Sequence, residues 1–150
     1  MGSERVTILD SYPFQNSVRV RWQMDADPIT LTTYQSAVDT KAAELAPVLI
    51  NLDPGDAAQM IRAIAEQRGR AWSDYAMAVV TQCPYASARG LQGMDEGVAI
   101  LRSYKHLLDL SVARYPLPKL VLSACHRHWA DCRAQIQEFL GLQSAGSLGP

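Results

Sequence analysis

The chain has 150 residues, with 14 Lys and Arg against 15 Asp and Glu, which gives a formal net charge of −1. This length is enough for one domain with a sizeable core, and the balanced charge excludes a broad basic surface for nucleic acid or an anionic membrane. Hydrophobic residues make up 48% of the chain and charged residues 19%, which excludes a disordered protein.

The N-terminal part of the chain predicts one short strand and one long helix. Residues 5–9 are β-branched and apolar and run into a turn, so they are expected to form a buried strand. Helical spacing of apolar residues follows over residues 28–46. Asp27 is suited to cap that helix, and Pro28 is suited to its first turn.

A second strand and two further helices are predicted in the middle of the chain. Residues 48–52 are almost all apolar without alternation, which is typical of a strand that is covered on both faces. A helix is expected to follow and to end at Gly69, because glycine readily terminates a helix. Another helix is expected over residues 72–82, and the Gly-, Ser- and Ala-rich segment 85–93 predicts a loop.

The C-terminal part predicts a long helix, a third strand and a last helix. Asp95 is suited to cap the long helix, which Pro116 breaks. Residues 119–123 form the third apolar run, and an amphipathic helix then ends at Gly141.

Short apolar strands that alternate with longer helices predict an α/β fold with a parallel sheet. We expect a helix-rich fold with a small sheet of about three strands. Residues 1–142 are expected to form a single domain, and residues 143–150 a frayed tail. Three parallel strands are few for an open α/β sheet, so the sheet is expected to be incomplete.

Signals for targeting are absent from the sequence. No apolar run is long enough for a signal peptide or a membrane span. The 3 cysteines are an odd number without the spacing of a disulfide framework. We therefore expect a soluble, cytoplasmic protein.

Several segments resemble the later half of P-loop kinases of the nucleoside, nucleotide and small-molecule type. The run PVLINLD (47–53) is similar to that family's strand P-x-L-I-x-L-D, and EQRGRAW (66–72) is similar to the end of the helix that leads to an arginine-bearing lid. ILDSYPFQ (8–15) is similar to the family's third strand, which ends in an acidic residue near the substrate. LVLS (120–123) and EFL (138–140) look like the last strand and the C-terminal helix.

This resemblance implies roles for three residues near the N-terminus. Asp10 would bind the substrate hydroxyl or act as a catalytic base, with Tyr12 and Gln15 as substrate-binding companions. The alternative is that Asp10 is a turn aspartate whose carboxylate accepts hydrogen bonds from the amides of residues 11–14.

The resemblance also implies a phosphate-binding role for three arginines. Arg62, Arg68 and Arg70 would clamp phosphate oxygens from a lid, since guanidinium groups suit that geometry. The alternative is a solvated helix end whose cations complement the helix dipole.

The phosphate loop of the family, G-x-x-x-x-G-K-[ST], does not occur in this sequence. The chain starts at what would be the third strand, so it is expected to be either a fragment or a naturally short product. Intact relatives use ATP and Mg²⁺. Without backbone amides and a lysine around the phosphates, this chain alone is expected to bind no cofactor and to be inactive.

One cluster of residue types suits a metal, namely Cys125, His126, His128 and Cys132. Its spacing matches no zinc-finger pattern. Cys132 also shares an apolar helical stripe, where a buried thiol behaves as a small hydrophobe. We therefore expect no metal site.

Two functional hypotheses follow. The first is a truncated P-loop-kinase-like domain, related to ATP-dependent phosphotransferases that act on a small hydroxyl-bearing substrate. The alternative is a non-catalytic interaction or assembly module. The expected partner is a second copy of the chain or a missing N-terminal phosphate-loop segment, and neither nucleic acid nor a membrane is expected.

Overall fold

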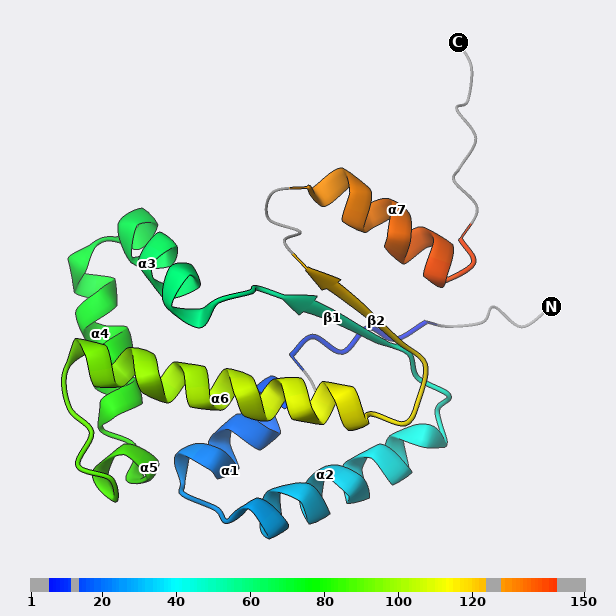
Figure 1. Ribbon diagram of the computed structural model, residues 1–150. Coiled ribbons are helices and arrows are strands. Elements are labelled where there is room, and N and C mark those ends of the chain that lie inside the picture. Colours follow the sequence, from blue (N-terminus) through cyan, green and yellow to red (C-terminus); the bar gives the residue numbers. More distant parts are fainter. Residues whose placement is uncertain (1–5, 12–13, 124–127, 143–150) are drawn as a thin grey trace.

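Figure 1 shows the computed structural model of the protein, which describes residues 6–11, 14–123 and 128–142. In chain order its elements are η1 (Phe14–Val18), α1 (Arg19–Gln23), α2 (Pro28–Ala43), β1 (Leu49–Asp53), α3 (Ala57–Arg68), α4 (Arg70–Thr81), α5 (Pro84–Ser87), α6 (Met94–Arg114), β2 (Lys119–Ser123) and α7 (Trp129–Phe139). The predicted α/β class and its helix-rich character are confirmed.

The sheet consists of β1 and β2, which pair in parallel. Their register runs from Leu49 opposite Lys119 to Asp53 opposite Ser123. The chain between them passes through α3, α4, α5 and α6, which is the long crossover that parallel strands require. Both strands lie within one residue of the ranges that their apolar runs predict.

The strand expected over residues 5–9 is not formed in the described residues. Val6 to Leu9 belong to no strand, and the side chains of Val6 and Ile8 are 88% and 87% exposed. The apolar, β-branched composition of this segment favours a strand, but a strand also needs a neighbour that pairs with its backbone. The sheet has two strands within the described part of the chain, so the expectation of about three is corrected.

The two faces of the sheet are covered by different helices. On one face Leu49 packs against Val112 and Tyr115, at the end of α6. On the other face Leu122 packs against Cys132 of α7. Figure 1 shows α6 and α7 on opposite sides of the two strands.

The main core lies among helices rather than on the sheet. Its buried residues come from α1, α2, α6 and the segment around α5: Trp22, Leu31, Cys83, Ala86, Ile100 and Tyr104. The ring centroid of Trp22 lies 4.3 Å from that of Tyr85 and 5.2 Å from that of Tyr104. Aromatic packing therefore ties the N-terminal helices to α6.

α2 starts at the residue that the sequence predicts, with Asp27 as its cap. The carboxylate of Asp27 accepts hydrogen bonds from the backbone N–H of Ile29 at 2.9 Å and of Thr30 at 3.0 Å, and Pro28 occupies the first turn. The predicted cap is confirmed, while α2 ends at Ala43, three residues before the predicted end.

Other boundaries differ in detail. Gly69 has φ 83°, a conformation that favours glycine, and it separates α3 from α4. α6 begins at Met94, with Gly93 at the cap position, so Asp95 lies in the first turn and is not the cap. The predicted loop 85–93 contains most of the short α5. Within the described ranges, no helix combines the length and the apolar character that a membrane span needs.

Candidate functional site

A charged hollow lies at the carboxyl end of β1. Its volume is about 200 Å³, and its lining comes from the start of α3 and from one side of α6: Gly55, Asp56, Ala57, Arg102, Lys105, His106 and Asp109. Asp53, the last residue of β1, reaches this lining through its ion pair with Lys105. The hollow thus lies where the end of a parallel strand meets the start of a helix, which is where open α/β folds bind ligands.

Lys105 joins two carboxylates across this hollow. Its Nζ lies 3.0 Å from Oδ1 of Asp53 and donates to Oδ1 and Oδ2 of Asp109 at 2.8 Å and 2.9 Å. Burial lowers the pKa of Lys105, but hydrogen bonds to Asp109 and Asp53 outweigh burial, and its pKa is raised overall. Lys105 is therefore a fixed cation, with its side chain 21% exposed.

Asp53 is held as a carboxylate. The backbone N–H of Gly55 donates to its Oδ1 at 2.9 Å. This bond is the main cause of the lowered pKa of Asp53, and Lys105 lowers that pKa further. Gly55 has φ 79°, which lets the chain turn sharply from β1 towards α3.

Asp56 completes the charged lining at the start of α3. Its Oδ1 accepts from the backbone N–H of Gln59 at 2.8 Å, and its Oδ2 lies 3.7 Å from Nη2 of Arg102. The Gln59 amide and then Arg102 hold the pKa of Asp56 below its ordinary value. The hollow therefore offers hydrogen-bond acceptors on carboxylates and donors on Lys105 and Arg102 side by side, an arrangement that can bind the hydroxyl groups of a neutral molecule.

Asp10 is not among the residues that line this hollow. It is exposed, and its Oδ1 accepts a hydrogen bond from Oγ of Ser11 at 3.3 Å. Ser11 has φ 60°, which is consistent with a turn at this point. Tyr12 lies outside the described residues, and Gln15 belongs to η1, with its side chain also outside what the structure describes.

The three arginines lie along α3 and at the start of α4, and all are exposed. The guanidinium of Arg68 lies 5.5 Å from the ring centroid of Trp72, and Nε of Arg70 lies 3.7 Å from Oδ2 of Asp74. At a rise of about 1.5 Å per residue, Arg68 is roughly 16 Å along α3 from the end that lines the hollow. The structure therefore does not bring Arg68 into the hollow, and its surroundings match the solvated helix end.

The cysteine–histidine cluster is only partly described. Cys125 and His126 lie outside the described residues, His128 directly precedes α7, and Cys132 is buried within it. Cys132 takes part in a disulfide bond, so its sulfur is not a thiolate ligand in this structure. Within the described ranges, no three His, Cys, Asp or Glu side chains come together as a metal site.

Sequence reasoning missed the residues of the charged hollow. The rule that selected Asp10, an acidic residue directly after an apolar strand, applies equally to Asp53. The spacing of Lys105 and Asp109 by four residues indicates an ion pair on one helix face. Nothing in the spacing indicates that Lys105 also meets Asp53, because that contact depends on how α6 packs against β1.

Comparisons of this chain with models of known protein families, with curated protein sequences and with solved structures find no match.

Proposed function

We propose that the chain is the substrate-side part of a P-loop-kinase-like phosphotransferase domain, and that it does not transfer phosphate by itself. The observation that supports this proposal most directly is the charged hollow at the carboxyl end of β1, where Lys105 lies between Asp53 and Asp109. In the intact domain, the γ-phosphoryl group of Mg·ATP would pass to the hydroxyl oxygen of a small substrate, with cleavage of its bond to the β–γ bridging oxygen and release of ADP. The hydroxyl proton passes to a carboxylate, for which Asp10 is the proposed base.

The chemistry of the hollow favours a hydroxyl-bearing substrate over a strongly anionic one. Lys105 is already paired with two carboxylates, and Arg102 lies near Asp56. An added phosphate would have to compete with these carboxylates and would meet their negative charge. Hydroxyl groups can instead donate to the carboxylates and accept from Lys105 without separating the existing pairs.

The open sheet supports the view that part of the domain is missing. β1 pairs on one edge with β2, and the described residues supply no strand for its other edge. Val6 to Leu9 have the composition of a strand and pair with nothing in the described part of the chain. One strand placed between this segment and β1 would give both of them a partner. We propose that this strand carries the phosphate loop that the sequence lacks, which would then lie beside Asp10.

The proposed substrate contacts of Tyr12 and Gln15 depend on this completed arrangement, as does the proposed phosphate contact of Arg62, Arg68 and Arg70. These exposed arginines have no phosphate group to bind until a phosphate loop holds a nucleotide near them. ATP and Mg²⁺ belong, in this proposal, to the completed domain.

The alternative is a non-catalytic assembly module, and exposed apolar side chains on the sheet favour it. Leu52 and Val121 are each about half exposed, although they lie on the two strands of a parallel sheet. Parallel sheets are normally covered on both faces. Another polypeptide could cover these apolar side chains and so stabilise the sheet, and this role requires no catalytic activity.

The reading frame upstream of the codon for Met1 distinguishes the phosphotransferase proposal from the assembly module. We expect it to encode G-x-x-x-x-G-K-[ST] in frame, because this loop precedes the third strand in such domains. A polypeptide that spans both parts should phosphorylate a small hydroxyl compound. Asp10→Asn should lower kcat by about 100-fold or more, because a general base typically contributes that much.

The matched control is Asp95→Asn in the first turn of α6, an exposed carboxylate outside the charged hollow, which should leave kcat unchanged. A frame without a phosphate loop would contradict the catalytic proposal and favour the assembly module. Micromolar binding of Mg·ATP to the 150-residue chain alone, measured by calorimetric titration, would contradict our account of the missing phosphate site.

A further inference from the structure

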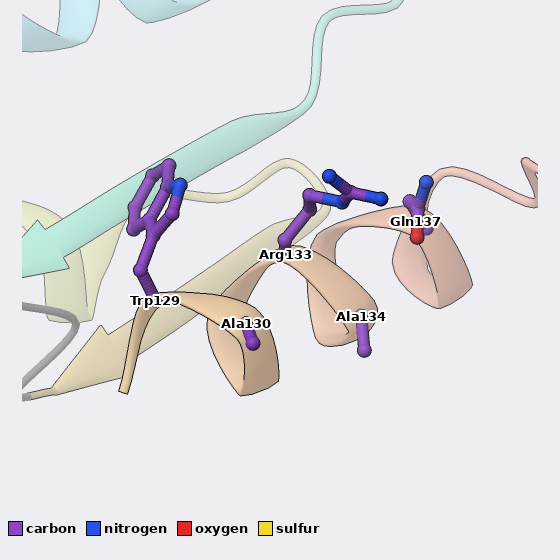
Figure 2. A pocket seen from close by; sticks show the side chains of 5 residues that line it. All are labelled: Trp129, Ala130, Arg133, Ala134 and Gln137. Atoms are coloured by element: carbon purple, nitrogen blue, oxygen red, sulfur yellow. The ribbon is translucent and has the colours of Figure 1, made fainter. Parts of the chain in front are cut away.

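One face of α7 forms an open hollow of about 420 Å³, lined by Trp129, Ala130, Arg133, Ala134 and Gln137. Figure 2 shows Trp129, Arg133 and Gln137 projecting from one side of the helix, with the two alanines beside them. The Trp129 side chain is 56% exposed, although an apolar side chain of this size is normally covered. This face is separate from the charged hollow at β1.

The charges of α7 fall on two ridges. At 100° per residue, Trp129, Arg133 and Gln137 form one ridge along the helix. Asp131 and Glu138 are seven residues apart and lie on a second ridge. The alanines lie between the two ridges.

None of the charged side chains on these ridges has an opposite charge within ion-pair distance in the described part of the chain. Arg133 has no acidic residue three or four positions away, and Glu138 has no basic one. α7 therefore presents an unpaired cation on one ridge and unpaired carboxylates on the other.

We propose that this face of α7 binds the same face of a second copy of the chain. Two parallel helices related by a two-fold axis along their length place the Arg133 ridge of each opposite the acidic ridge of the other. The contact between Arg133 and the carboxylates of Asp131 and Glu138 then forms twice, as a two-fold interface requires. The alanines let the two backbones approach, and Trp129 of each copy loses its exposure.

A second copy fits this face better than an unrelated acidic helix does. An acidic helix would pair with Arg133 but would leave Asp131 and Glu138 facing its own carboxylates. Because both signs of charge occur on one face of α7, the face is complementary to itself. The formal net charge of −1 adds almost no repulsion between copies.

Association is tested by sedimentation of the full chain between about 5 and 200 µM, a range that also detects weak dimers. We expect a concentration-dependent dimer, and we expect Trp129→Ala to raise its dissociation constant by about 10-fold or more. The matched control is Tyr75→Ala on α4, an aromatic residue that is 70% exposed and should leave the dimer unchanged. A monomer throughout this range, or a dimer that Trp129→Ala leaves intact, would overturn the proposal.

Paired charge reversals test the contact itself. Arg133→Glu faces the acidic ridge of its partner with a like charge, and Glu138→Lys faces Arg133 with a like charge, so each variant alone should dissociate. In an equimolar mixture, Glu at position 133 of one chain faces Lys at position 138 of the other, and the dimer should return.

Both variants should keep the helical circular dichroism of the wild type, since both positions are exposed and a lysine near a helix C-terminus is favourable. Lys41→Glu, an exposed charge reversal on α2, is the control and should dimerise like the wild type. A mixture that stays monomeric would show that these charges do not meet across the interface.

Discussion

The contact between Asp53 and Lys105 joins the end of β1 to the middle of α6. It links residues that are far apart in the sequence, at 3.0 Å between Oδ1 and Nζ. Both side chains are only partly exposed, so their interaction is screened less than that of a fully solvated pair. At the scale of single residues, this contact is both the centre of the candidate site and a tie between sheet and helix.

Asp53 is expected to contribute to stability in a way that depends on pH. Its pKa in the folded chain lies below the ordinary value of 3.8, so its contribution is present above about pH 4 and is lost as the pH falls through the lowered pKa. Asp53→Asn should therefore lower the free energy of unfolding by roughly 1 kcal/mol at pH 7. Urea titrations at several pH values should show this difference shrink below pH 4, whereas Asp74→Asn should show little difference at any pH. A deficit in Asp53→Asn that stays constant down to pH 3 would contradict this origin.

How far single residues can be predicted from sequence depends on the range of their contacts. The sequence predicts the capping role of Asp27 correctly because a helix cap is a local feature that involves only the next three residues. The pairing of Lys105 with Asp53 was missed because it depends on the packing of α6 against β1. Asp10 shows the opposite case, since its position after an apolar run predicts a site while its described contact is with the neighbouring Ser11.

Elements follow the same division between local and long-range causes. β1 and β2 were found within one residue because each apolar run has the other as its partner. Residues 5–9 have a similar composition but no strand beside them among the described residues, so their pattern alone did not make a strand. The short α5 was missed because Pro84 to Ser87 is a single helical turn, too short for a periodic pattern.

The cap of α2 gives a test at the scale of one element. The Asp27 carboxylate satisfies two of the first free backbone N–H groups of the helix, and Asp27→Ala leaves them without that partner. We expect a measurable loss in the free energy of unfolding, determined by urea denaturation, and a much smaller loss for Asp27→Asn, because asparagine is also a good helix cap. If Asp27→Ala were as stable as the wild type, this end of α2 would not depend on its side-chain cap.

At the scale of the whole molecule, the core is divided unevenly. The cluster around Trp22, Ile100 and Tyr104 joins α1, α2, α5 and α6, whereas the sheet packs on two smaller clusters at Val112 and Leu122. The α/β class could be predicted from the order of apolar runs. That most of the burial lies among helices could not, because it reflects which helical faces meet, and this depends on contacts between segments far apart in the chain.

This division predicts that the sheet opens before the helical core. Opening β1 and β2 exposes only the small clusters around Val112 and Leu122, while opening α6 exposes Ile100 and its aromatic neighbours. Hydrogen exchange at pH 7, followed by mass spectrometry, should therefore show strand amides exchanging at least about 10-fold faster than amides in the middle of α6, as expected of a less stable unit.

Two core truncations distinguish this behaviour from a single cooperative unit. Leu122→Ala should speed exchange in the strands and in α7 and leave α6 almost unchanged, because Leu122 packs against Cys132 of α7 and not against the helical core. Ile100→Ala should cost roughly 2–4 kcal/mol and speed exchange in all elements, because it removes a nearly inaccessible side chain from the main cluster. If Leu122→Ala sped exchange in α6 as much as in β2, sheet and helices would unfold together. The two-stranded sheet would then already be as stable as the helical core, without a further strand at the open edge of β1.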